Sequence, residues 1–289
     1  MIATSIARIR QRPRLALTGL LWIIGLVMAI LWLLPIIWMV STSFKPPGQV
    51  MTTDVQWLPR SPTLENYVAV FKRPIFTWFM TSAITSIAST IASLATGALA
   101  GYALARLNFP GRGVVFTIMI AAIMIPSEMT IIPLFLAFLK LRLVNSYMAI
   151  ILPSIASVFS VYLFRQFFLT LPRELEDAAS IDGCNRYQTF WMIALPLARP
   201  AAVAGAILLF SSHWNAFLWP LLVMLREEWK TLPVGVATFG SVGGAGQTQI
   251  QGFGIAMAAV TLLALPSLIV FLLLQRYFIE GVTRTGVKG

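Results

Sequence analysis

Six long apolar runs dominate the chain, and each is long enough to cross a bilayer as a helix. They cover approximately residues 15–40, 76–105, 114–139, 146–168, 201–225 and 253–276. A hydrocarbon core needs about 20 mostly apolar residues in a helix, and a helix leaves no backbone polar group unsatisfied in lipid. We therefore predict an all-α integral membrane protein with six transmembrane helices, folded as a single domain over residues 1–289.

The composition supports the same conclusion and excludes other classes of protein. Hydrophobic residues make up 58% of the chain and charged residues 11%, whereas a soluble domain carries about 25% charged residues. The net charge of +11 is spread between the apolar runs, so we expect no nucleic-acid partner. The single cysteine and single histidine lie in different regions. We therefore expect no disulfide, no metal site and no intramembrane enzyme.

The basic residues predict how the chain is oriented. If both termini lie on one side, that side carries 13 of the 21 Lys and Arg residues and the other side carries eight. Cytoplasmic loops carry the excess of Lys and Arg. We therefore expect both termini in the cytoplasm, together with the loop 169–200 between the fourth and fifth runs. The first run is too long for a signal-peptide core, so we expect it to remain as a span.

The stretch from Pro172 to Pro196 is the least apolar long segment of the chain. Its sequence predicts a helix that starts with acidic residues, as the helix dipole favours, and that ends or bends at Gly183. Helical spacing places Leu175, Ala178, Ala179 and Asp182 on one face. Two interpretations remain open at this point. The helix either docks into a groove on a basic partner or lies along the membrane surface.

The spacing within this stretch resembles a known signature. Asp177-Ala178-Ala179, three residues, Gly183, nine residues and Ile193-Ala194-Leu195-Pro196 resemble the EAA motif of ABC-importer permeases. The longer run LPRELEDAASIDG resembles the carbohydrate-uptake class, to which maltose-type and glycerol-3-phosphate-type permeases belong. The C-terminal Gly286-Val287-Lys288-Gly289 is similar to the tail of the maltose-type second permease. Asp177 departs from the Glu usual in the motif, and keeps the charge on a shorter side chain.

The resemblance implies a type I importer permease fold and a coupling helix that docks on a cytosolic ATPase. The residues that it implies for coupling are Glu174, Glu176, Asp177, Ala178, Ala179, Asp182 and Gly183, and it implies a tail contact through Gly286 and Lys288. The implied partners are a homologous permease, two ATPase subunits and an extracytoplasmic solute-binding protein, all at a bacterial or archaeal cytoplasmic membrane. The implied substrate is a sugar or related solute. Glycerol 3-phosphate remains an alternative.

Polar residues inside the apolar runs are candidates for lining the solute path, because such groups are costly in lipid. The fifth run contains Ser211 and, after it, Ser212, His213, Trp214 and Asn215, and the third run contains Glu128 between Pro126 and Pro133. Hydrogen bonding between helices is the alternative for the first group, and capping of freed backbone amides is the alternative for Glu128. The two prolines predict a kinked or locally opened helix. Gly97 and Gly101, at GxxxG spacing, predict close helix packing.

ATP is expected to bind to the partner ATPase, with Mg²⁺, and not to this chain. The glycine-rich segment FGSVGGAGQT lacks the features of a phosphate-binding loop, since Ser241 replaces the first Gly and Gln247 replaces the Lys. An ion-coupled secondary transporter is the rival from another class. It is expected to show repeated halves or a network of ionisable groups at mid-membrane, and the sequence shows neither.

Overall fold

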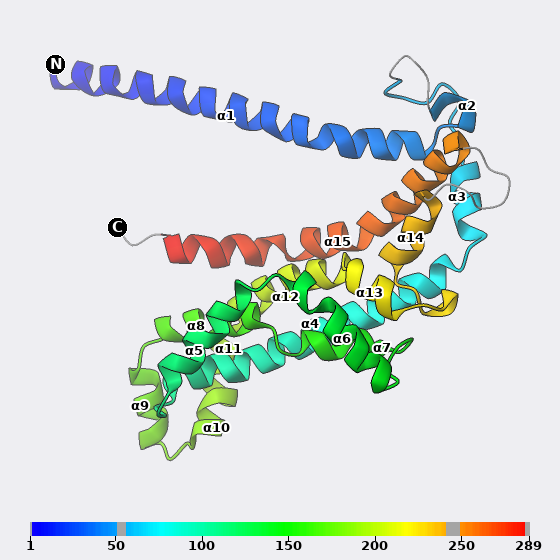
Figure 1. Ribbon diagram of the computed structural model, residues 1–289. Coiled ribbons are helices and arrows are strands. Elements are labelled where there is room, and N and C mark those ends of the chain that lie inside the picture. The colour runs from blue at the N-terminus through cyan, green and yellow to red at the C-terminus, as the bar shows by residue number, and fades with distance from the viewer. Residues whose placement is uncertain (1, 51–55, 241–248, 287–289) are drawn as a thin grey trace. The chain divides into compact units, whose positions relative to one another are not determined.

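A computed structural model describes residues 2–50, 56–240 and 249–286, and every regular element in these ranges is helical (Figure 1). The described residues divide between two compact units. The first comprises Met1–Val70 with Phe239–Thr261, and the second comprises Phe71–Thr238 with Leu262–Gly289. The helices α3 (Glu65–Phe71), α14 (Leu232–Gly240) and α15 (Gln249–Gly286) each run from one unit into the other. The prediction of a single domain stays a prediction.

The first unit contains α1 (Ile2–Ser43), α2 (Pro47–Val50), most of α3 and the start of α15. Polar side chains fix the turn after α1. The Asn66 amide donates to the carbonyl oxygens of Ser43 and Lys45, each at 2.9 Å. Lys45 is 2% exposed, and its ammonium group donates to the Gln56 carbonyl oxygen at 2.5 Å and to Thr42 Oγ1 at 3.3 Å. Burial lowers the pKa of Lys45, because it removes the ammonium from water.

The second unit is organised around α4 (Ile75–Arg106), against which α7 (Tyr147–Ser154), α8 (Val158–Thr170) and α12 (Arg199–Trp214) pack. A methyl group added to Gly97 would lie 2.1 Å from Ser160 Oγ, and one added to Gly101 would lie 2.8 Å from the Arg165 backbone nitrogen. Only glycine lets the α4 and α8 backbones approach so closely. The predicted close packing at the GxxxG pair is thus confirmed.

Four described helical segments are long and apolar enough to span a membrane without a sharp bend: Thr18–Ser43, Ile75–Arg106, Tyr147–Thr170 and Gly252–Gln275. Two further pairs of helices pass the same test but are bent at a break. They are α5 (Arg112–Ile123) with α6 (Ser127–Lys140), bent by 97°, and Arg186–Leu197 with α12, bent by 70°. The predicted kink near Pro126 and Pro133 is confirmed at Pro126, where the α5–α6 break falls, whereas Pro133 lies within the continuous α6. The count of six spans stays a prediction.

The fifth apolar run differs from the prediction of one helix over 201–225. Here α12 ends at Trp214, and the short α13 (Leu218–Val223) follows after residues 215–217. Asn215 caps α12, and its side-chain amide donates to the Ser211 carbonyl oxygen at 2.8 Å. The Asn215 backbone nitrogen donates to the same carbonyl oxygen at 3.1 Å, so the residue closes the end of α12 with both its backbone and its side chain. A 3₁₀ turn, η2 (Glu227–Trp229), and then α14 follow α13.

Candidate functional site

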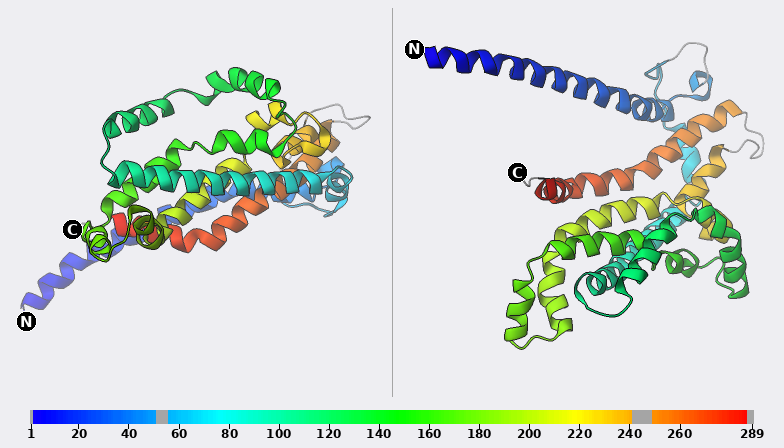
Figure 2. Two further views of the ribbon diagram at one scale, coloured as in Figure 1. Left: turned by 90° about the horizontal axis from the view of Figure 1, so that it is seen from below. Right: turned by 60° about the vertical axis from the view of Figure 1, so that its left-hand side comes forward.

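The predicted coupling segment forms a helical hairpin that extends beyond the ends of α4 and α8 (Figures 1 and 2). Its arms are α9 (Glu174–Ile181) and a continuous helical stretch of α10 (Arg186–Thr189), the π-helical η1 (Phe190–Ala194) and α11 (Leu195–Leu197). The acidic first turn of α9 is present as predicted. The predicted helix end at Gly183 is confirmed, because this residue has φ +84°.

Local hydrogen bonds explain why the hairpin turns where it does. The Gly183 nitrogen donates to the Ser180 carbonyl oxygen at 3.2 Å, and the Cys184 nitrogen donates to the Ala179 carbonyl oxygen at 2.9 Å. This pair of bonds is the Schellman arrangement, which needs a left-handed residue. Asn185 and Gln188 then form a reciprocal capping box at the start of α10. The sequence therefore encodes both the end of α9 and the start of α10.

An aromatic cluster joins the base of the hairpin to the body of the second unit. The Tyr102 ring of α4 lies 5.4 Å from the Phe168 ring of α8 and 5.1 Å from the Phe190 ring of η1. Phe164, Phe168 and Phe190 are each no more than 4% exposed. Aromatic rings packed at such distances stabilise a contact beyond the area that they bury. The second arm therefore packs against α4 and α8 through this cluster.

The far end of the hairpin is exposed and partly apolar. Ile181 is 85% exposed and Tyr187 is 80% exposed, and Ala178, Asp177 and Asp182 are also exposed. Ala179 is different, since it is only 3% exposed within the chain. This burial corrects the prediction that Ala179 shares an exposed docking face with Leu175, Ala178 and Asp182. Ala179 packs inward, and Ile181 was missed because helical spacing does not show which side of a short helix is covered.

The residues expected along the solute path occupy different surroundings. Trp214 is 1% exposed, its indole nitrogen donates to the Leu263 carbonyl oxygen at 3.0 Å, and its ring packs on Phe79 and Phe210. The prediction that Trp214 lines the path is therefore corrected to helix packing. His213 Nε2 lies 3.5 Å from Ser93 Oγ, while Ser212 and Asn215 are exposed.

Glu128 lies in the first turn of α6, directly after the break at Pro126. Its side chain is exposed and accepts a hydrogen bond from Ser127 Oγ at 3.2 Å. An exposed carboxylate in an apolar segment needs a polar neighbour outside the helix. The placement agrees with a role at a path or at a partner subunit, and that role stays a prediction.

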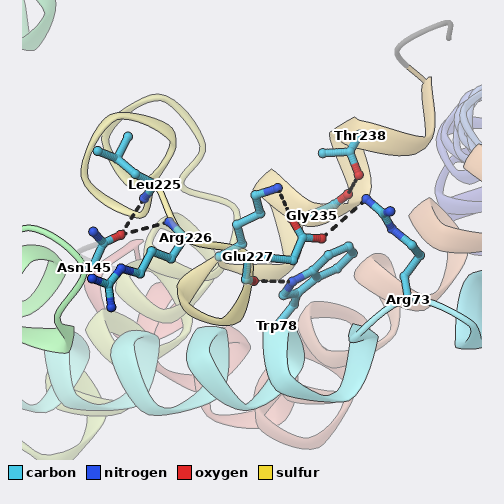
Figure 3. Close-up of polar contacts among 9 residues, drawn as sticks. Arg73, Trp78, Asn145, Leu225, Arg226, Glu227, Gly235 and Thr238 are labelled. Atoms are coloured by element: carbon cyan, nitrogen blue, oxygen red, sulfur yellow. Dashed lines mark hydrogen bonds and ion pairs between the residues drawn. The ribbon is translucent and has the colours of Figure 1, made fainter. Parts of the chain in front are cut away.

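The other end of α4 carries a polar cluster that the sequence reasoning missed, shown in Figure 3. The Trp78 indole nitrogen donates to the Glu227 carbonyl oxygen at 2.9 Å, and the Glu227 carboxylate pairs with Arg73 at 3.4 Å and with Lys230. Asn145 Oδ1 accepts from the Leu225 nitrogen at 2.7 Å and from the Arg226 nitrogen at 3.0 Å. We call this set the loop clamp, because it holds the turn between α13 and α14.

Two predictions fall at or beyond the limit of the described residues. Lys288 lies outside them, and Gly286 is the last residue of α15. The proposed tail contact therefore stays a prediction. The glycine-rich segment also lies largely outside the described residues, which omit 241–248.

Comparison with known proteins assigns this architecture to a class of membrane transport component. Residues 93–284 match the family described as binding-protein-dependent transport system inner membrane component, and the chain belongs to this family. The chain is thus an integral inner-membrane permease subunit, not an enzyme, and works with a solute-binding protein and an ATPase. The resemblance to ABC-importer permeases is confirmed.

Named relatives match along almost the whole chain. An arabinooligosaccharides transport system permease protein of Halalkalibacterium halodurans is 40% identical over 259 residues, which cover 88% of this chain and 91% of the relative. A trehalose/maltose transport system permease protein of Thermococcus litoralis is 34% identical over 279 residues, covering 94% and 98%. A solved chain from a bacterial ABC transporter involved in import of the acidic polysaccharide alginate shares the fold, with a TM-score of 0.80, 24% identity and coverage of 91% and 96%.

Proposed function

We propose that this chain forms half of the translocation path of an ATP-driven importer for a sugar or oligosaccharide. The named relatives transport arabinooligosaccharides and trehalose or maltose, and the LPRELEDAASIDG run supports the same class. The path is shared with a homologous permease, and its lining includes Ser212, His213, Asn215 and Glu128. Their hydroxyl, imidazole, amide and carboxylate groups suit the hydrogen bonding of a polyhydroxylated solute.

The observation that carries the coupling role is the exposed tip of a hairpin whose second arm packs at its base on α4 and α8. Ile181 and Tyr187, on either side of the turn, present exposed apolar surface, whereas the aromatic cluster at the base of the second arm is buried. We take these exposed side chains as the docking surface, because apolar surface that gathers in one place marks interaction sites. The tip of the hairpin inserts into a cleft on a cytosolic ATPase, and closure of two ATPase subunits moves the two permeases. This movement alternates the access of the path.

The nucleotide belongs to the ATPase, and this chain binds neither ATP nor Mg²⁺. Six spans place both termini and the hairpin in the cytoplasm, as the excess of Lys and Arg requires. Cys184 tests this orientation directly, because it is the chain's only cysteine, is half-buried and follows α9. An impermeant thiol reagent is expected to label Cys184 in inverted vesicles and not in right-side-out cells. The reverse pattern would overturn the topology.

The coupling role is tested in a reconstituted complex with the neighbouring permease, ATPase and binding protein. Ile181→Glu is expected to lower solute-stimulated ATP hydrolysis by about tenfold or more, since a charge buried in an interface without a partner costs more than ~1.4 kcal/mol. Thr170→Glu adds the same charge on an exposed residue at the end of α8 and serves as the matched control. Equal rates in both variants would contradict docking through the tip.

The solute class is tested on the binding protein that acts with this permease. A thermal-shift screen with arabinooligosaccharides, maltose, trehalose and glycerol 3-phosphate is expected to show stabilisation by a sugar, because a ligand that binds the native state raises its melting temperature. Stabilisation by glycerol 3-phosphate alone would replace the sugar proposal with the alternative substrate.

A further inference from the structure

Three helix ends meet at Arg106. This residue is the last of α4, and its Nη2 donates to the carbonyl oxygen of Leu171, the C-cap of α8. Its Nε lies 3.3 Å from Oε1 of Glu176, in the first turn of α9. A cation is favourable at the C-terminus of a helix and a carboxylate at the N-terminus. The pair therefore complements the dipoles of all three helices with two side chains.

Burial makes this contact sensitive to change. The side chain of Arg106 is 6% exposed and that of Glu176 is 25% exposed. In such surroundings the loss of one charge leaves the other desolvated and without its partner. The guanidinium reaches its two neighbours from separate nitrogens: Nη2 donates to the Leu171 carbonyl oxygen, while Nε forms an ion pair with Glu176 Oε1 without a hydrogen bond. A lysine ammonium, with its single nitrogen, does not reproduce this geometry.

The ion pair between Arg106 and Glu176 holds the first arm of the hairpin, α9, whereas the aromatic cluster holds the second arm. Phe190 fixes the second arm of the hairpin to Tyr102, one helical turn before Arg106. Of the first arm, only Ala179 in the α9 helix is fully buried. Arg106 and Glu176 thus connect α9 to α4 at the point where a displacement of the tip must enter the membrane-spanning helix.

We propose that Arg106 is a positioning residue for energy coupling, which transmits displacement of α9 to α4 through its ion pair with Glu176. This inference rests on the proposed docking of the hairpin on an ATPase. Without the pair, the ATPase still binds the tip and hydrolyses ATP, but α9 moves without carrying α4. The result is ATP hydrolysis with little transport.

The test uses the complete complex in proteoliposomes and measures solute uptake and ATP hydrolysis in the same preparation. Glu176→Gln is nearly isosteric and removes only the charge. We expect it to lower the number of solutes imported per ATP by about tenfold, which corresponds to ~1.4 kcal/mol of coupling, while hydrolysis continues. Glu227→Gln makes the same chemical change in the exposed pair at the other end of α4 and is expected to keep the wild-type ratio.

A second measurement does not depend on transport. Cys184 directly follows the Schellman turn of α9, so its rate of reaction with a thiol reagent reports how firmly α9 is held. We expect faster labelling in Glu176→Gln and in Arg106→Gln than in the wild type, and no change in Glu227→Gln. A local opening that becomes tenfold more populated raises the rate by the same factor.

The outcomes separate this inference from the function on which it rests. Wild-type coupling ratios and wild-type labelling rates in both Glu176→Gln and Arg106→Gln would overturn the role of the pair and leave the docking intact. A wild-type complex that binds no ATPase, or whose uptake needs no ATP, would overturn the proposed function itself. A lowered ratio in Glu176→Gln together with an unchanged ratio in Glu227→Gln supports the inference.

Discussion

The two ends of α4 are both held by an arginine, a glutamate and an aromatic residue, but in different ways. At the start of the helix, Arg73 and Glu227 form a pair whose side chains are 48% and 42% exposed. At its end, Arg106 and Glu176 form a pair whose side chains are 6% and 25% exposed. Exposed ion pairs contribute little to stability, whereas the loss of one partner from a buried pair is costly.

Different kinds of interaction stabilise the two ends of α4. At the start of α4 the loop clamp relies on hydrogen bonds to backbone groups, from Trp78 to the Glu227 carbonyl oxygen and from two backbone nitrogens to Asn145. At the other end an ion pair joins α4 to α9, and the same arginine donates to a carbonyl oxygen at the end of α8. We infer that removing a charge lowers stability most at the hairpin end. At the loop clamp, adding volume or removing a hydrogen bond lowers it most.

The largest expected effect is that of Arg106→Ala. It leaves Glu176 buried without its partner and removes the donor to the Leu171 carbonyl oxygen. We expect destabilisation near the lower end of the roughly 3–5 kcal/mol typical of a broken buried pair, because Glu176 keeps a quarter of its side chain exposed. Fluorescence-detected size-exclusion after heating measures this as a lower midpoint. Arg73→Ala is the matched control, and an equal loss there would contradict the comparison.

The next largest loss of stability is expected at the loop clamp, from a substitution that adds a methyl group. A methyl group on Gly235 would lie 2.1 to 2.6 Å from atoms of the Trp78 ring, and Trp78 is fully buried. Gly235→Ala is therefore expected to destabilise by the upper part of the ~1–3 kcal/mol seen for overpacking. Gly113→Ala is the control, because its added methyl meets nothing within 4 Å. An unchanged heating midpoint for Gly235→Ala would show that the ring moves freely.

Much of this architecture was predictable from short-range patterns in the sequence. Apolar runs located four helices long enough to span a membrane, Pro126 predicted the break between α5 and α6, and the glycine pair predicted the α4–α8 contact. Gly183 predicted the end of α9. Each of these signals acts within a few residues of the feature that it determines, so a single sequence carries it.

The features that were missed depend on contacts between distant residues. The spacing that grouped Ala179 with Leu175 is correct for a helix, but only the packed structure shows that Ala179 faces inward. The burial of Trp214 was missed for the same reason, because Leu263, whose carbonyl oxygen accepts its hydrogen bond, lies in another helix. Asn145 bonds to residues 80 and 81 positions further along the chain, and no periodicity marks such a pair.

A smaller effect is expected from Asn145→Ala. The substitution removes the acceptor for the Leu225 and Arg226 nitrogens and places alanine at φ +58°, a left-handed backbone that asparagine tolerates better. Because these nitrogens lie where water can reach them, we expect a loss of about 1–2 kcal/mol. Asn145→Asp keeps the acceptor and is expected to stay close to wild type. The heating midpoints of the two variants measure the difference, and equal midpoints would assign no stabilisation to these bonds.

The smallest effect is expected from Glu227→Gln. Its carboxylate is 42% exposed, and its backbone carbonyl still accepts from Trp78 after the substitution. The loss is expected to stay below ~1 kcal/mol and to shrink further in high salt, which screens exposed pairs. Trp78→Phe, which removes the indole donor and keeps an aromatic ring, is expected to cost more. If Glu227→Gln lowered the heating midpoint as far as Arg106→Ala does, burial would not be what separates the two ends of α4.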